Sequence, residues 1–275
     1  MLPSCDILVT NRGLPLKNLI TKGDNNMIYV TGDTHADFRR FTTSIFPEQK
    51  KMTKNDYVII LGDFGGVWYQ EETPKEKYWL NWLNNRPFTT LFIDGNHENF
   101  DRLYSYPTKE FNGGKVHEIR PSVLHLQRGE IFTLQNHTFF AFGGASSHDI
   151  SDGILDPIKD KDKIKKWNKD MTKMFRVNKV SWWEQELPTQ EEKDNGLTNL
   201  KKHNNKVDFI LTHCAPASTT ALLGQGLFKQ DQLTYYLEEI RSQVDYGHWL
   251  FGHHHDNRQI NNKDLLLYEQ IIRIA

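Results

Sequence analysis

The sequence has little cysteine, and this excludes one large class of small proteins. Its two cysteines, Cys5 and Cys214, lie far apart in a chain of 275 residues. They provide no disulfide framework of the kind that stabilises secreted domains. Because sparse cysteine is typical of proteins from a reducing compartment, we expect the chain to be cytoplasmic.

Long apolar runs and net charge are also missing. No run approaches the ~20 apolar residues that a membrane-spanning helix requires, so we expect no membrane partner. The opening residues MLPSCDILVTNRG lack a basic segment followed by an apolar one, and we expect no signal peptide. The formal net charge is −1, so no overall basic field favours nucleic acid as the main partner.

What is present is a repeated pattern along most of the chain. Short apolar runs are followed at once by polar, glycine-containing segments in MIYVTGDTH, YVIILGDFGG, TTLFIDGNHE, VDFILTHCAP and HWLFGHHHD. Runs of this length bounded by glycine are typical of buried strands in a sheet that is covered on both faces. Residues 1–26 show no clear periodicity, and we predict an N-terminal extension there and a folded domain over 27–275.

Two segments between these runs have the pattern of amphipathic helices. Residues 73–85 begin with Thr73 as N-cap and Pro74 in the first turn, which predicts a helix. A second helix is predicted over 229–243. The residues expected on the two apolar stripes are Tyr78, Trp79, Trp82 and Leu83 in the first helix, and Leu233, Tyr236, Leu237 and Ile240 in the second.

The middle and the end of the chain favour further strands. Residues 113–145 resemble a β-meander with Gly129 and Asn136 at turns, and the last 18 residues read as strands joined by the turn NNKD. Strands alternating with helices, then successive strands, predict an α/β protein with a mixed or two-sheet core. The lysine-rich residues 156–179 are interpreted as a solvated helical insertion or as a basic flap over an anionic substrate.

All five strand ends carry side chains that can bind metals. In open α/β sheets, ligands collect beyond the carboxyl ends of the strands, where residues distant in sequence converge. Carboxylates, an amide oxygen and imidazoles suit borderline-hard cations, and this number of ligands suits two ions that share a carboxylate. The candidate residues are Asp33, His35, Asp63, Asn96, His97, His213 and His253 to His255.

The blocks GDTH, GDFGG, GNHE, TH and GHHH occur in this order over residues 27 to about 260. They resemble the calcineurin-like metallophosphoesterase superfamily, whose pattern has corresponding blocks in the same order. The resemblance implies a four-layer α/β/β/α fold, with a central two-sheet β-sandwich flanked by helices. It also implies a first metal held by Asp33, His35, Asp63 and His255, and a second held by Asp63, Asn96, His213 and His253.

The three consecutive histidines need separate interpretation. In an extended segment, side chains at i and i+2 point to the same side and the one between them points away. We therefore expect His253 and His255 to be ligands, and His254 to line the cleft or to pack, with a direct contact to substrate as the alternative.

The resemblance also assigns catalytic roles. His97 matches the family histidine that contacts phosphate and protonates the leaving oxygen, and Asp63 matches the bridging ligand. Gly66 and Val67 stand where many phosphatases of the superfamily have aspartate and arginine, which argues against a phosphoprotein substrate. Ala36 stands where many relatives have glycine, and we expect this change to be tolerated.

Two further segments contain candidate substrate contacts. His148 and Asp149 lie in the polar loop 142–153, which is interpreted as a surface turn or as a part of the substrate site. Arg176 precedes two tryptophans at 182 and 183, which form either a core pair or a base-stacking wall with an arginine for phosphate.

We therefore predict a dinuclear metal-dependent phosphoester hydrolase, in which a metal-bridging hydroxide attacks phosphorus in line. The ligand types suit Mn²⁺, Fe or Zn²⁺, and the expected substrate is a small phosphoester or a nucleotide. The alternative is a phosphodiesterase or nuclease that acts on nucleic acid, which is supported by the lysine-rich insertion. A protein phosphatase is a weaker alternative. A catalytically inactive binding protein should lack one or more ligands, and none is missing here.

Overall fold

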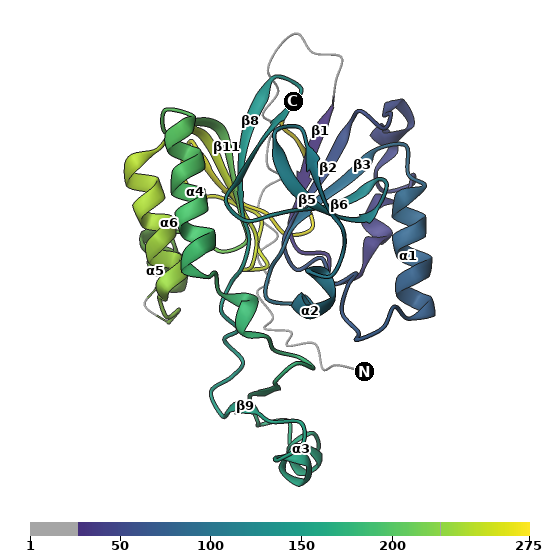
Figure 1. Cartoon of the computed structure of the whole chain (residues 1–275), viewed down its shortest axis with the longest axis vertical. Coiled ribbons are helices and arrows are strands. Elements are labelled where there is room, and N and C mark those ends of the chain that lie inside the picture. Colours follow the sequence, from purple (N-terminus) through teal and green to yellow (C-terminus); the bar gives the residue numbers. More distant parts are fainter. Residues whose placement is uncertain (1–26, 226) are drawn as a thin grey trace.

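Two β-sheets packed face to face form the centre of the computed structural model, which describes residues 27–225 and 227–275 (Figure 1). Helices cover the outer face of each sheet, so the predicted α/β/β/α architecture is confirmed. The predicted N-terminal extension over 1–26 lies outside the described residues. Within the described residues, no helix is long and apolar enough to span a membrane.

The first sheet contains parallel strands at its centre and antiparallel strands at its edges. Its strand order is β15-β1-β2-β3-β6-β5-β4 among the described residues. The strands are β15 (Ile272–Arg273), β1 (Ile28–Thr31), β2 (Tyr57–Leu61), β3 (Thr89–Ile93), β6 (Val123–Leu126), β5 (Gly114–Arg120) and β4 (Thr108–Phe111).

The second sheet follows the order β13-β14-β12-β11-β8-β7 among the described residues. Its strands are β13 (Arg258–Gln259), β14 (Asp264–Leu266), β12 (Asp245–Phe251), β11 (Lys206–Thr212), β8 (His137–Phe142) and β7 (Glu130–Leu134). The register of β11 on β12 pairs Thr212 with Phe251, so these two strands end side by side.

The five apolar runs form the central strands that the sequence predicts. β1, β2 and β3 are parallel neighbours in the first sheet, and β11 and β12 are parallel neighbours in the second. Every residue of β1 and β3 is buried, because these strands are covered on both faces. Parallel neighbours end at the same edge, which places the segments after these strands close together.

The predicted β-meander is divided between the two sheets. β5 and β6 pair in the first sheet, whereas β7 and β8 pair in the second. Gly129 and Asn136 have φ angles of +78° and +68°, which is the left-handed conformation that these turns require. The chain therefore crosses from one sheet to the other near Gly129.

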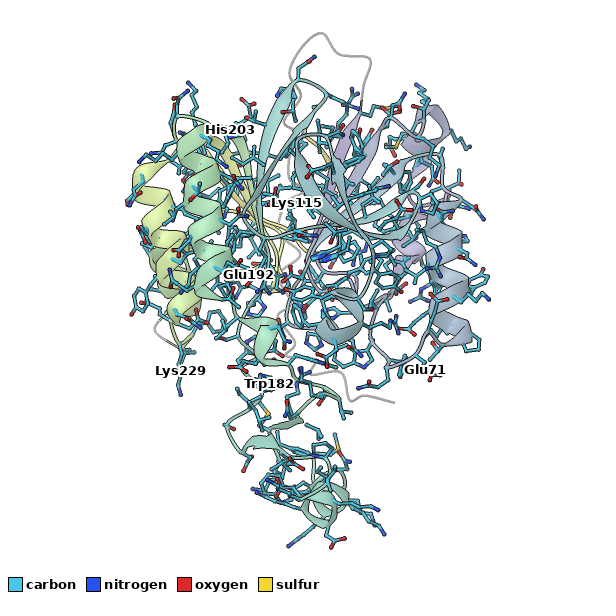
Figure 2. All side chains as sticks on the ribbon, in the orientation of Figure 1. Glu71, Lys115, Trp182, Glu192, His203 and Lys229 are labelled. Atoms are coloured by element: carbon cyan, nitrogen blue, oxygen red, sulfur yellow. The ribbon has the colours of Figure 1, made fainter. Side chains whose placement is uncertain are left out.

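The helices bury their apolar faces against the outer surfaces of the sheets. Figure 1 shows α1 on one side of the molecule, and α4, α5 and α6 on the opposite side. Figure 2 shows side chains filling the space between the sheets, where Val30, Ile59, Phe139 and Leu211 belong to one buried cluster. The helices are α1 (Pro74–Asn84), α2 (Phe100–Leu103), α3 (Lys161–Trp167), α4 (Gln190–Lys202), α5 (Ala217–Gly224) and α6 (Gln232–Gln243), with 3-10 turns η1 (Phe38–Phe41), η2 (Pro47–Lys51) and η3 (Glu184–Glu186).

The two predicted helices are present, with one correction. α1 begins after Thr73, whose side chain accepts from the Glu76 N–H while Glu76 reaches back to the cap in a capping box. Leu83 is buried in α1, but Tyr78 is 60% exposed, so its assignment to the apolar stripe was wrong. Tyr78 lies outside the sector of the helix that faces the sheet. In α6, the four predicted apolar residues are all buried.

The lysine-rich segment belongs to an arm that projects from one end of the molecule (Figure 1). The arm contains α3 and a two-stranded parallel sheet made by β9 (Gly153–Leu155) and β10 (Phe175–Val177). No residue of α3 is buried, as expected for a solvated helical insertion. Figure 2 places Trp182 at the narrow junction between the arm and the body.

Candidate metal centre

The loops that follow the five central strands meet at one end of the two sheets. The His213 ring donates from Nδ1 to the Leu61 carbonyl at 2.6 Å, which joins the end of β11 to the end of β2. The His253 N–H donates to Asp33 Oδ1 at 3.0 Å and joins the loop after β12 to the loop after β1. The sheet ends therefore bring together the side chains that the sequence predicts to converge.

The first predicted ligand set forms a compact cluster. One potential ligand atom from each of Asp33, His35, Asp63 and His255 lies within 4.8 Å of the others. The Nε2 atoms of His35 and His255 approach to 3.0 Å, and His255 Nε2 lies 3.1 Å from Asp33 Oδ2. Two imidazole nitrogens and two carboxylates directed at one point are a donor set that suits a divalent transition metal.

The residues of the second predicted set lie near Oδ1 of Asp63. His213 Nε2 lies 3.3 Å from Asp63 Oδ1, and the His213 and His253 ring centres are 5.0 Å apart. Asn96 Oδ1 and His213 Nε2 are buried and have no hydrogen-bond partner. Buried polar atoms are rarely left without partners. A cation bound at this position would give both atoms a partner.

The tautomer of His213 also suits metal binding. A carbonyl oxygen only accepts hydrogen bonds, so the proton of the neutral ring lies on Nδ1 and the Nε2 lone pair faces Asp63. Burial alone lowers the pKa of His213, but the carboxylates of Asp63 and Asp33 raise it to about 10. The buried carboxylates of Asp33 and Asp63 and the histidines around them, which we call the cradle, therefore favour positive charge at Nε2. A proton or a metal ion can supply that charge.

The negative charge of this cradle is deeply buried. Asp33 and Asp63 are 0% and 2% exposed. Burial raises the pKa of each carboxyl and is the largest single effect, but the neighbouring histidines, with His213 foremost, together outweigh it, and both pKa values are below the ordinary range. Buried ionised carboxylates require compensating positive charge, so the donor set fits a divalent ion.

The backbone at the cradle adopts conformations that are uncommon for residues with side chains. His35, Asp63, His253 and His255 have φ angles of +44°, +44°, +70° and +47°. The segment 253–255 is therefore not extended, and the alternation from which we expected His253 and His255 to share one side does not apply there. Residues other than glycine that adopt the left-handed backbone conformation cost energy, and they are frequent at functional sites. Here the four residues with this conformation are all candidate metal ligands.

His97 lies beside the cluster, close to an arginine from the arm. His97 Nε2 is 4.0 Å from Asp63 Oδ2 and 3.3 Å from Arg176 Nη2. A guanidinium only donates, so Nε2 of His97 accepts in this arrangement. Burial lowers the pKa of His97 to about 4, with the Arg176 charge acting in the same direction. His97 is therefore neutral at pH 7 and carries no proton on Nε2 here.

The candidate substrate contacts are also brought to this end of the molecule. Arg176 Nε donates to both carboxylate oxygens of Asp149 at 2.9 Å. The His148 ring centre lies 5.0 Å from that of His253. His254 stacks on Phe228 at 4.9 Å, and its ring centre lies 5.1 Å from that of His253.

Two glutamates support the site without being predicted to do so. Glu98, within the GNHE block, accepts from the Phe64 N–H at 2.7 Å and holds the loop after Asp63. Glu186 accepts from Ser147 Oγ at 2.9 Å, and Ser147 Oγ accepts from Asn96 Nδ2 at 3.4 Å. These two hydrogen bonds orient the Asn96 amide so that its Oδ1 has no hydrogen-bond partner. The motif offered a signal for Glu98, whereas Glu186 lies far from Asn96 in sequence and offered none.

The fold and the cradle define a protein with a candidate metal site at the ends of two packed sheets. The family model described as calcineurin-like phosphoesterase matches residues 27–257, which is most of the chain. The protein belongs to the calcineurin-like phosphoesterase family and is a metal-dependent phosphoric ester hydrolase. No curated protein matches the chain.

Proposed function

We propose that this protein is a dinuclear metallophosphoesterase that hydrolyses a small phosphoester or a nucleotide. The observation that carries the proposal is the pair of buried, unpartnered atoms Asn96 Oδ1 and His213 Nε2 beside the compact cluster around Asp63. One ion would be held by Asp33, His35, Asp63 and His255. The other would be held by Asp63, Asn96, His213 and His253.

Asp63 is the proposed bridging ligand because its two oxygens face different partners. Oδ1 accepts from the Asn96 N–H at 2.8 Å and lies 3.3 Å from His213 Nε2. Oδ2 lies 3.8 Å from His35 Nε2. Each oxygen of Asp63 thus faces the residues of one proposed ligand set.

Two bound divalent cations, of Mn, Fe or Zn, would supply an activated water nucleophile and neutralise charge on the phosphoryl group. The chain itself supplies the surroundings of that group. We propose that Arg176 and the protonated form of His97 contact the phosphoryl oxygens, because a neutral Nε2 can only accept, with Asp149 fixing the guanidinium. The planar donor array of arginine suits phosphate, and Arg176 comes from the arm, whereas Val67 occupies the motif position where relatives often have arginine.

The experiment measures hydrolysis and metal content together. The purified chain is reconstituted with Mn²⁺ and assayed on an aryl phosphomonoester and on the matching aryl phosphodiester. We expect hydrolysis of at least one ester and about two ions per chain by elemental analysis. Asp63→Asn should abolish hydrolysis and lower metal content while the circular dichroism spectrum is unchanged. Full activity of this variant, or one ion per fully active chain, contradicts the proposal.

The substrate contacts have a separate test. Arg176→Lys keeps the charge but loses the planar donor array, and we expect kcat/KM to fall about tenfold or more with unchanged metal content. Lys173→Arg is a matched control, because Lys173 lies on the same arm and pairs with Asp152 rather than with a site residue. Equal effects of the two substitutions would exclude a phosphate role for Arg176.

A second candidate substrate is nucleic acid, and the arm is the observation that favours it. α3 exposes lysines at positions 161, 163, 165 and 166, and Lys163 lies over the Trp167 ring at 4.2 Å. Basic side chains beside an aromatic ring are features that bind single strands. Binding of a labelled oligonucleotide should weaken steeply between 50 and 200 mM salt if phosphate contacts carry it. Absence of binding at 50 mM salt excludes this candidate.

A further inference from the structure

A cavity of about 220 Å³ opens directly beside the candidate metal centre. His35 and His97 belong to its lining, so the cavity is continuous with the proposed phosphoryl site. The remaining wall combines aromatic rings with two glycines and the polar side chains of Thr73, Lys75 and Glu76. The other lining residues include Trp68, Tyr69 and Trp79.

Trp68 is held in place before any ligand binds. Its ring stacks on His97 at 5.8 Å and 27°, and its edge contacts Trp183, which is fully buried. Its backbone N–H donates to Glu76 Oε1 at 2.7 Å, and its carbonyl accepts from Asn99 Nδ2 at 3.2 Å. A wall fixed on both ring and backbone loses little conformational freedom when a ligand stacks on it.

Trp79 presents a second ring to the cavity from α1. It packs against the buried Phe38 at 6.0 Å and remains partly exposed. The carboxylate of Glu76, which also lines the cavity, is occupied by Arg102 and by the backbone of Trp68. The cavity therefore offers aromatic rings, and its one carboxylate, Glu76, is already paired, which favours recognition by stacking.

Gly65 and Gly66 both belong to the lining, at points where the fold leaves no room for a side chain. An ideal Cβ on Gly66 would lie 2.4 Å from a carbon of the Phe64 ring, so a side chain does not fit without rearrangement. An apolar cavity of about 150 Å³ accommodates benzene, and this one is larger.

We propose that this cavity binds the base of a nucleoside phosphate while the phosphate occupies the site at His97 and Arg176. The assignment rests on the proposed function, and it names the substrate class as nucleotides. The base stacks on Trp68 or Trp79, in the manner in which bases stack on aromatic side chains in single-strand-binding proteins. Such stacking tolerates different bases because every base has a π-face.

The first experiment measures binding without hydrolysis. The full-length chain, with and without Mn²⁺, is titrated with adenosine while tryptophan fluorescence is recorded. Adenosine has no phosphoester, so this readout does not depend on catalysis. We expect saturable quenching by adenosine and none by ribose, with the adenosine effect lost in Trp68→Leu or Trp79→Leu. Trp82→Leu is the control for packing on the same helix, because Trp82 contacts the Trp79 ring at 5.3 Å and stacks with Arg86 but does not line the cavity.

The second experiment isolates the contribution of the base at the active site. Adenosine 5′-monophosphate and ribose 5-phosphate, which differ only in the base, are compared as inhibitors of aryl ester hydrolysis. We expect the inhibition constant of ribose 5-phosphate to be about tenfold higher or more. This ratio should fall toward one in Trp68→Leu and in Trp79→Leu, and should stay unchanged in Trp82→Leu.

The outcomes separate the two proposals. Hydrolysis with equal inhibition by the two phosphates and no quenching by adenosine overturns the nucleotide assignment and leaves the proposed function intact. Failure to hydrolyse any ester overturns the proposed function, while adenosine quenching still decides whether the cavity binds a base. If circular dichroism shows that one tryptophan variant is unfolded, the other variant and the comparison of the two phosphates with the wild-type chain still test the proposal.

Discussion

At the scale of single residues, the site depends on close approaches that side chains would prevent. An ideal Cβ on Gly95 would lie 2.1 Å from Asp63 Oδ1 and 2.8 Å from His213 Nε2. Asp63 itself is held by the N–H groups of Asn96 and His97. Position 95 therefore requires glycine, because any side chain there would overlap the proposed bridging carboxylate.

Gly95→Ala is expected to displace Asp63 and to lower kcat/KM about 100-fold or more, since a displacement of about 1 Å at an active site has effects of that size. Steady-state kinetics and Mn²⁺ titration provide the measurement. Gly113→Ala is the control: an ideal Cβ there has its nearest neighbour at 3.6 Å, although its φ of +97° is strained for alanine. The control should lose stability and keep its activity per folded molecule.

Ala36, a change that we expect to be tolerated, adopts a backbone conformation that costs energy. Its φ is +61°, which is the left-handed region that costs an alanine about 1–2 kcal/mol. We expect Ala36→Gly to raise the free energy of unfolding by about 0.5–1 kcal/mol, because part of the relief is offset by the greater freedom of glycine in the unfolded chain. Urea unfolding measures this change, and a destabilised variant would contradict the strain argument.

At the scale of elements, the arm contributes to the site at its base rather than at its tip. Arg176 in β10 reaches Asp149 and His97, and Val177 donates its N–H to Ser181 Oγ at 2.9 Å. By contrast, Ile158 and Met171 near the tip are 85% and 87% exposed. The tip therefore adds little buried apolar area to the fold.

Replacement of residues 158–172 by a short glycine-serine linker tests this division. The unfolding free energy should change by less than about 1 kcal/mol, because substitutions at exposed positions have small effects. Hydrolysis of a small aryl ester should continue, because Arg176 and Asp149 remain. A loss of more than about 2 kcal/mol, or of activity toward small esters, would show that the tip supports the body.

At the scale of the whole molecule, a buried polar network lies where the chain crosses between the sheets. Arg128 and His125 both contact the Asp94 carboxylate, at 2.5 Å and 3.0 Å, and His125 Nδ1 lies 2.9 Å from His117 Nδ1. His125 thus directs Nε2 at the Asp94 carboxylate and Nδ1 at His117. Arg128 also donates to the Gln185 carbonyl at 2.7 Å, which links the crossing to the segment that returns from the arm.

This network predicts loss of stability in mild acid. Burial lowers the pKa of His117 to about 4, with the His125 charge acting in the same direction, whereas the unfolded chain has the ordinary value of about 6.5. Between these values the unfolded state binds more protons, so the free energy of unfolding falls as the pH falls. The contribution is complete above pH 6.5 and is lost at up to about 1.4 kcal/mol per pH unit below it.

Urea unfolding at pH 7.0 and 5.0 measures this effect, with His117→Asn as the test variant. The wild-type chain should lose more stability between the two values than the variant, which lacks the titrating ring. His203→Asn is the control, because His203 lies at the exposed end of α4. Equal losses in wild type and His117→Asn would assign the acid sensitivity to other groups.

The sequence by itself determined the central strands, both amphipathic helices and the convergence of the candidate metal ligands. These features depend on local patterns: buried strands are short apolar runs bounded by glycine, and parallel strands deliver their ends to one edge. A cap such as Thr73 is likewise read from a few adjacent residues. The sequence also showed that Gly66 and Val67 differ from the residues of many phosphatases of the superfamily, but it did not show the cavity beside Gly66.

Only the tertiary structure decided which distant residues complete the site. It brought Arg176 to His97 and placed Glu186 behind Asn96, and it assembled Trp68 and Trp79 around one cavity. It also showed left-handed backbone at His253 and His255 in place of an extended segment. Such contacts depend on how the sheets, helices and arm pack, because packing joins residues that share no local sequence pattern.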